Sequence, residues 1–174
     1  MKIVVDTNIL IQIIKKGGRN DLHCPRTKEK VSSPEARAEA LVDLLTSRKD
    51  QIIIPAPAFS EVLVRIEHKL HTEYQKTLNH AACFTLQAFD DLSAIECARL
   101  VNDQEIKQIS PHEDKKKISF DRQIIAICKA YSADELWTHD CDMLKKAEAI
   151  GITVKSLSDI EPKMTQLELV DAAG

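Results

Sequence analysis

The sequence of 174 residues lacks the features that mark a membrane or disulfide-rich protein. No apolar run approaches the ~20 residues that a membrane-spanning helix needs. The apolar start, Lys2 to Leu10, is interrupted by Asp6 too early to be the core of a signal peptide. The five cysteines are odd in number and form no C-x-x-C pair, which argues against a disulfide framework and against a zinc knuckle. These absences predict a cytoplasmic protein with no membrane partner.

A histidine metal site is also missing. The six histidines are scattered, and only His68 and His71 lie close together, three positions apart. No third ligand is near them in the sequence, so a solvated helix face explains the pair better than zinc does.

The sequence has no excess of positive charge, since its net charge is −3. A nucleic-acid partner would therefore have to meet a local basic patch. Residues 15–34 provide one, with six Lys or Arg against two Asp or Glu, in a loop marked by glycine, proline and serine. Such a loop is usually only solvated. The alternative is that Lys15, Lys16 and Arg19 bind phosphates of RNA.

What the sequence does contain is a regular alternation of apolar strands and helices with the length of one ordinary domain. Strands are predicted at residues 2–5, 51–55, 83–89, 134–137 and 151–155. Helices are predicted at residues 7–14, 34–47, 57–70 with an extension toward 80, 91–105, 120–131 and 141–149. Short apolar strands joined by helices indicate a parallel sheet covered on both faces, which is a three-layer α/β/α sandwich.

Four acidic residues are expected near one edge of this sheet. Asp6 follows the first strand, and Asp140 follows the fourth. Glu61 lies in the helix after the second strand, and Asp121 opens the helix at 120–131. In sheets of this kind ligands bind at the carboxyl ends of the strands. The four acids are therefore candidates for a shared site.

Each acid taken alone also has a structural explanation. Asp6 and Asp140 are suitable helix N-caps, and Asp121 in a first turn would complement the helix dipole. Glu61 precedes Arg65 by four residues, as in an exposed helical ion pair. Four carboxylates at one edge would nevertheless repel one another unless a cation were bound. Oxygen ligands without cysteine or histidine favour Mg²⁺ or Mn²⁺.

The sequence resembles the PIN domains in four motifs, which occur in the family's order. They are VVDTNIL (4–10), SEVL (60–63), FDRQIIAIC (120–128) and WTHDCDML (137–144). The resemblance covers roughly residues 1–155, with the basic loop at 15–34 as an insertion and 156–174 as a C-terminal tail. It implies a metal-dependent ribonuclease with a PIN-like parallel sheet of order 3-2-1-4-5. Many bacterial members are the toxin half of VapBC-type toxin–antitoxin pairs.

The resemblance also implies which residues act. The catalytic, metal-binding acids would be Asp6, Glu61, Asp121 and Asp140. Asn8 and Thr138 match polar positions that support the acids. Asp142 is a fifth acid, two residues beyond Asp140. Asp140 is favoured as the ligand because it is nearer the strand end, and whether Asp142 binds metal or only stabilises the helix start stays open.

The predicted reaction is hydrolysis of an RNA phosphodiester with one or two Mg²⁺ or Mn²⁺ ions. No histidine is needed as a base, and His139 is expected to point away from the site if its segment is extended. A cognate antitoxin and a second copy of the chain are the expected protein partners, the second from the resemblance and the mixed helical stretch at 73–80.

Three other classes of protein compete with a nuclease as explanations of the sequence. A non-catalytic PIN-like module that binds RNA or protein should have lost one or more acids. A dehalogenase-like phosphatase needs a second Asp two residues after the first, where this chain has Asn8. A response-regulator receiver needs paired acids near the end of its first strand.

Overall fold

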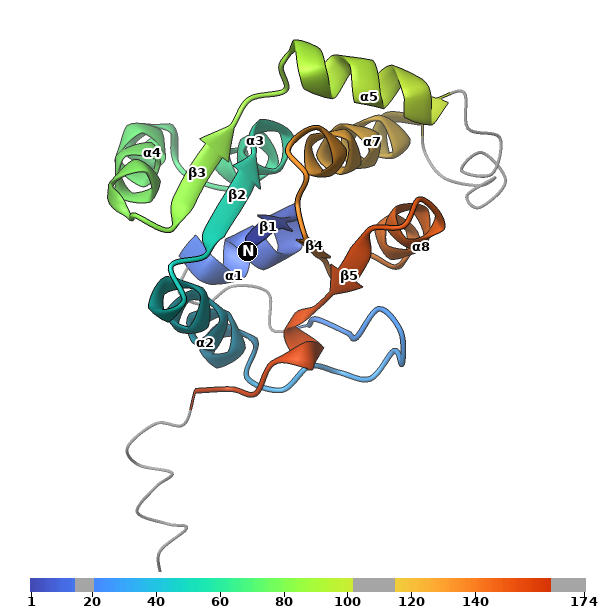
Figure 1. The fold of residues 1–174 in the computed structure, drawn as a ribbon. Helices are drawn as coiled ribbons and strands as arrows, with labels where there is room; N and C mark the ends of the chain where they lie inside the picture. Colours follow the sequence, from blue (N-terminus) through green and yellow to red (C-terminus); the bar gives the residue numbers. More distant parts are fainter. Residues whose placement is uncertain (15–20, 102–114, 164–174) are drawn as a thin grey trace, which may run out of the picture.

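The computed structural model describes residues 1–14, 21–101 and 115–163, with side chains through Leu100 and again from Phe120. The described residues form a parallel five-stranded sheet of order β3-β2-β1-β4-β5 (Figure 1). The strands are β1 (Lys2–Val5), β2 (Gln51–Pro55), β3 (Phe84–Gln87), β4 (Glu135–Trp137) and β5 (Thr153–Lys155). The structure thus confirms the predicted parallel sheet and its order.

Helices cover both faces of this sheet (Figure 1). They are α1 (Thr7–Ile14), α2 (Pro34–Ser47), α3 (Ala56–Leu63), α4 (His71–His80), α5 (Asp91–Val101), α7 (Lys115–Ala130) and α8 (Cys141–Ala149). Two short 3₁₀ helices, η1 (His68–Leu70) and η2 (Leu157–Asp159), complete the described elements. Helix α3 contacts both α1 and α7, so it lies where the two helical layers approach each other.

The alternation of side chains along β1 explains how both layers are held. Ile3 and Val5 belong to the core cluster that also contains residues of α1 and α2. Val4, between them, belongs to the cluster formed with α7 and α8. Successive strand residues point to opposite faces, so a central strand covered on both faces must be apolar throughout. This requirement ends at Asp6, where the strand reaches the edge of the sheet.

Helix α3 is shorter than predicted and ends at Leu63. The helix does not continue past Leu63: Val64 is 86% exposed, while Ile66 still packs against the core. The ring Nε2 of His71 contacts the carbonyl oxygens of Leu63 and Ile66 at 2.9 and 3.0 Å. The ring thus contacts the last carbonyl of α3 and one in the turn that follows it.

Helix α7 begins earlier than predicted, at Lys115 instead of Phe120. The polar stretch before Phe120 does not break the helix, because lysine is a good helix former. Asp121 therefore lies in the second turn of α7, and the explanation that it complements the dipole from a first turn is wrong. The carboxyl end of the helix predicted at 91–105 lies outside the described residues.

The described part of the basic loop is packed against the domain. Leu22 and Val31 are each 5% exposed and belong to the core. Arg26 donates a hydrogen bond to the carbonyl of Val154 at 2.9 Å and forms an ion pair with Glu148. Residues 21–33 are therefore ordered along β5 and α8 rather than simply solvated. Lys15, Lys16 and Arg19 lie outside the described residues.

The segment after β5 also packs on the domain. Leu157 in η2 has no exposed surface and lies in the same core cluster as residues of α2. Arg37 of α2 donates hydrogen bonds to the carbonyl oxygens of Leu157 and Ile160. In the part of the chain that the structure describes, no helix has both the length and the apolar character needed to span a bilayer.

Candidate acidic active site

All four predicted acids line one pocket at the carboxyl edge of the sheet. The pocket has a volume of about 210 Å³, and its lining residues are Asp6, Thr7, Asn8, Ile11, Glu61, Arg65, Phe120, Asp121 and Asp140. A larger pocket of about 360 Å³ lies between α1, α4 and β3, but it is mainly apolar and Glu73 is its only acid. We place the chemistry in the smaller pocket because charged groups converge there.

Asp6 is held at the end of β1 by a dense set of hydrogen bonds. Its backbone N–H donates to the carbonyl of Trp137 at 3.0 Å. Its carboxylate accepts from the backbone N–H of Thr7 at 2.6 Å and from the hydroxyl of Thr138 at 2.8 Å. Burial, with smaller contributions from the charges of Asp121 and Asp140, raises the pKa of Asp6 from 3.8 to about 7, although the hydrogen bonds from Thr138 and Thr7 lower it. A cation in the pocket would favour the ionised form.

Thr138 connects Asp6 to Asp140. The Thr138 hydroxyl donates to Asp6 and accepts from the backbone N–H of Asp140 at 2.9 Å. Asp140 is the N-cap of α8, with Oδ1 accepting from the N–H groups of Asp142 and Met143 at 2.8 and 3.1 Å. The capping explanation is therefore right for Asp140, and its carboxylate lines the pocket while it caps α8.

Asn8 supports the site from the first turn of α1. Its side-chain oxygen accepts a hydrogen bond from the backbone N–H of His139 at 3.0 Å. The His139 ring is directed elsewhere, since Nδ1 contacts the carbonyl of His23 at 2.9 Å and Nε2 accepts from Leu157 at 3.2 Å. Burial lowers the pKa of His139, which favours the neutral ring. As expected, His139 does not line the pocket.

Glu61 is oriented by Thr7, whose hydroxyl donates a hydrogen bond to the Glu61 carboxylate. The spacing predicted an exposed ion pair between Glu61 and Arg65. The structure describes both residues, and they form no ion pair with each other. Helix α3 ends at Leu63, so Arg65 lies beyond the helical geometry on which that pairing depends. Arg65 and Glu61 instead line the same pocket.

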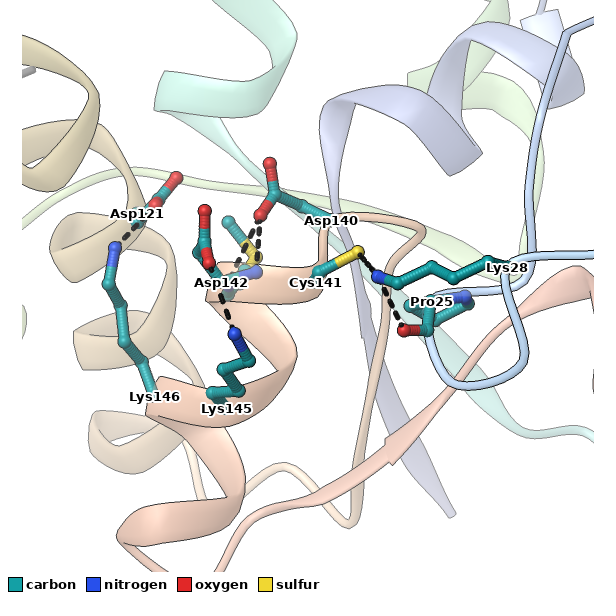
Figure 2. Close-up of polar contacts among 9 residues, drawn as sticks. Pro25, Lys28, Asp121, Asp140, Cys141, Asp142, Lys145 and Lys146 are labelled. Carbon is teal, nitrogen blue, oxygen red and sulfur yellow. Dashed lines mark hydrogen bonds and ion pairs between the residues drawn. The ribbon is translucent and has the colours of Figure 1, made fainter. Parts of the chain in front are cut away.

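Asp121 is paired with a lysine that the sequence analysis did not identify. The ammonium of Lys146 lies 2.9 Å from Oδ2 of Asp121 (Figure 2). Lys146 has no exposed surface and Asp121 is 5% exposed. Its position in the sequence could have indicated that it is buried, because Lys146 lies beside Met143 and Ala147 on the buried side of α8. Lysine at such a position is almost never buried unless it is paired.

Asp142 lies in the first turn of α8, and its backbone N–H donates to the Asp140 carboxylate. It does not line the pocket, and its Oδ1 is 3.7 Å from the ammonium of Lys145 on the exposed side of α8 (Figure 2). An acid in the first turn of a helix stabilises the helix dipole. The geometry therefore favours Asp140 over Asp142 as a ligand.

The donor set fits a hard divalent cation in its chemistry. Four carboxylates line the pocket without sulfur or imidazole, which is the combination that Mg²⁺ and Mn²⁺ prefer. Within residues 1–14, 21–100 and 120–163, no three His, Cys, Asp or Glu side chains are arranged closely enough to hold a metal ion as they stand. To bind one ion together, the four carboxylate side chains would have to rotate toward it.

Comparisons with known proteins agree with the fold. A family model described as PIN domain matches residues 3–158. No curated protein matches the chain. Among solved structures, VapBC2 from Rickettsia felis bound to a promoter DNA fragment is similar with a TM-score of 0.59 at 14% identity, over 90% of this chain and 98% of that one.

Two further solved structures have the same fold. VapC20 from Mycobacterium tuberculosis, a sarcin-ricin loop cleaving toxin, has a TM-score of 0.53 at 15% identity, over 87% of this chain and 96% of that one. DNA-bound VapBC from Salmonella typhimurium has a TM-score of 0.55 at 17% identity, over 90% of this chain and 98% of that one. At such identities the likeness concerns the fold.

Proposed function

Because the chain belongs to the PIN-domain family, we propose that it is a metal-dependent endoribonuclease that hydrolyses phosphodiester bonds of RNA. The observation that carries this proposal is that acids from four separate segments line one pocket at the carboxyl edge of the sheet. Helix capping alone explains Asp140, but it does not explain the positions of Glu61 and Asp121. A shared cation explains all of them.

The metal ligands in this proposal are Asp6, Glu61, Asp121 and Asp140. A bound Mg²⁺ or Mn²⁺ ion would lower the pKa of a water molecule and offset charge on the phosphate and the leaving oxygen. Thr138 holds the Asp6 carboxylate and the start of α8 in one arrangement. Asn8 holds the backbone between Thr138 and Asp140 by accepting from His139.

A pocket of carboxylates repels RNA, so basic groups are needed at its rim. Arg65 is exposed and lines the pocket, which suits it to contact a phosphate beside the scissile bond. Lys28 is exposed, and its ammonium contacts Sγ of Cys141, the residue after Asp140 (Figure 2). The proposal that Lys15, Lys16 and Arg19 bind RNA concerns residues outside the described ranges.

The test is cleavage of single-stranded RNA by the purified protein in Mg²⁺ or Mn²⁺. We expect EDTA to abolish cleavage, and Asp6→Asn and Asp140→Asn each to lower its rate by about 100-fold or more. Asp142→Asn is the matched control, because it changes an acid on the same helix outside the pocket. Cleavage that persists in EDTA would exclude metal dependence. Wild-type rates in either pocket variant would exclude the assigned ligands.

A second candidate function is a non-catalytic PIN-like module that binds RNA or protein. The observation in its favour is that the ammonium of Lys146 pairs with the carboxylate of Asp121. Such a module would bind single-stranded RNA equally well in EDTA and in Mn²⁺, and it would show no cleavage in a single-turnover assay with either ion.

The proposal extends to the protein's partners. VapBC complexes are among the similar structures, which supports a toxin role with a cognate antitoxin in the cytoplasm. A small open reading frame overlapping upstream, and co-purification of its product with this chain, would support that role. We also propose a homodimer, and light scattering that shows a monomer at all concentrations would exclude it.

A further inference from the structure

Phe120 is an exposed aromatic residue at the acidic pocket. Its side chain is 39% exposed and lines the pocket next to Asp121, the acid that follows it in the sequence. The chain has four Phe, two Tyr and one Trp, all within the described residues, and the other six are buried or partly buried. Phe120 is therefore the aromatic residue that the fold leaves exposed, and it lies where the substrate is expected.

The course of α7 explains why this ring borders the pocket instead of the core. Residues four apart on a helix share one side, so Phe120 and Ile124 lie on the same side of α7. Ile124 is 1% exposed and packs in the core with α8. One turn earlier, at Phe120, the same side of the helix has passed the edge of the core and reaches the pocket. The ring is thus available to a ligand.

Arg65 provides the second group that a nucleotide needs. It is exposed, lies two residues beyond the end of α3 and lines the same pocket as Phe120. Helix α3 contacts α7, so the two side chains come from neighbouring elements (Figure 1). A guanidinium binds phosphate oxygens, and an aromatic face stacks on a nucleobase. A phosphate and a base of one RNA strand can therefore be held together here.

We propose that Phe120 is a substrate-binding residue, on whose ring the base of an unpaired nucleotide stacks beside the phosphate that is cut. The nucleotide must be unpaired, because sequence-tolerant stacking on aromatic residues needs bases that are splayed out of a helix. This inference rests on the proposed function in taking RNA as the ligand, but it depends on no number or arrangement of metal ions. All bases have a π-face, so Phe120 should affect affinity more than sequence preference.

The experiment measures binding of the full chain to single-stranded RNA in EDTA, where binding is read apart from cutting. The oligonucleotides carry the fluorescent base 2-aminopurine at successive positions, and stacking on the ring quenches it. We expect Phe120→Ala to bind about 5–150-fold more weakly and to lose the quenching. Phe120→Trp should keep both properties. Phe120→Leu is apolar but has no aromatic face, so it should behave like Phe120→Ala.

Two controls separate stacking from other causes. Leu92→Ala should bind like the wild type, because Leu92 on α5 is 54% exposed and does not line the pocket. Arg65→Gln should flatten the slope of log affinity against log salt by ~0.7, whereas Phe120→Ala should leave that slope unchanged. The KM of cleavage in Mn²⁺ should rank the variants in the same order as binding does.

An RNA with an abasic nucleotide at the quenched position identifies the partner of the ring. With this RNA, Phe120→Ala should bind as tightly as the wild type, because the stacking base is already absent. If Phe120→Ala weakens binding of the abasic RNA as much as that of the intact RNA, the inference is overturned.

Each other result also has a definite meaning. If the wild type binds or cleaves RNA and Phe120→Leu equals it in affinity, quenching and KM, the inference is overturned and the proposed function stands. If the wild type neither binds nor cleaves single-stranded RNA, the proposed function fails and the inference fails with it. Urea unfolding checks that the variants fold, and Phe120→Leu carries the test if Phe120→Ala does not.

Discussion

The hydroxyl of Thr138 donates a hydrogen bond to Oδ2 of Asp6 at 2.8 Å, although the two residues are 132 positions apart. Thr138 follows β4 and Asp6 follows β1, and these strands are paired in the sheet. The same hydroxyl accepts from the backbone of Asp140. One fully buried side chain therefore fixes two of the proposed ligands relative to each other.

Replacing Thr138 by valine tests this connection. Valine keeps the shape but removes the hydrogen bond that Oδ2 of Asp6 accepts from Thr138 and the one that the N–H of Asp140 donates to it. We expect a loss of about 1–3 kcal/mol in the free energy of unfolding and a 10–100-fold loss of cleavage. Urea unfolding and RNA cleavage measure the two effects. Thr138→Ser keeps the hydroxyl and should retain both properties, and a valine variant equal to the wild type would contradict the role.

The raised pKa of Asp6 predicts how the metal-free protein responds to pH. Its pKa is 3.8 when unfolded and about 7 when folded, so the folded state binds the proton more tightly. This contribution to stability is complete below pH 3.8 and is lost as the pH rises through about 7. Across that window we expect the wild type to lose about 4 kcal/mol relative to Asp6→Asn, which does not titrate. Urea unfolding in EDTA at pH 4 and pH 8 checks this, and parallel pH curves for the two proteins would refute it.

His139 predicts a dependence on pH of the opposite sign. Burial lowers its pKa below 6.5. The neutral ring also accepts a hydrogen bond from Leu157 through Nε2, and protonation would remove that acceptor. The contribution is present above the unfolded pKa and is lost as the pH falls through the lowered folded pKa. We expect His139→Gln, which does not titrate, to lose less stability than the wild type between pH 7 and pH 5. Chemical unfolding at both pH values tests this, and equal losses would show that the ring is not buried neutral.

The basic loop predicts a salt effect on RNA binding. Replacing Lys15, Lys16 and Arg19 together by glutamine should weaken binding to different RNA sequences alike and leave Mn²⁺ affinity nearly unchanged. The slope of log affinity against log salt should flatten by ~0.7 for each lost contact with a single strand. Lys28→Gln, beside the start of α8, should flatten it by one such step. A slope that neither change alters would show that the loop does not touch RNA.

Local sequence pattern was sufficient for the elements whose boundaries depend on nearby residues. Helix α1 at Thr7–Ile14 and α8 at Cys141–Ala149 have the predicted bounds. In α8 the start is fixed locally, because Asp140 caps the helix that follows it. The parallel sheet follows from apolar strands that alternate with helices. The order of the strands, by contrast, was implied by the family resemblance and not by periodicity.

Boundaries that depend on distant contacts were not predictable in this way. The apolar pattern of 57–70 continued past Leu63, but the chain turns where His71 meets the end of α3. The start of α7 is a different case, because the polar residues before Phe120 suggested a break but include lysines, which are good helix formers. Intrinsic propensity is a weak guide wherever tertiary packing decides which residues face the core.

The candidate site likewise has features that depend on local sequence and features that depend on tertiary packing. The sequence by itself determined the types of the four acids and their places after or beside strands, because carboxyl strand ends share one edge. Only the tertiary structure decided that Lys146 is buried against Asp121 and that Thr138 bridges Asp6 and Asp140. These partners lie on different elements, so no spacing along the chain records them. Burial makes the loss of either partner costly, because the other would be left without a partner in the interior. That burial exists only once the helices have packed on the sheet.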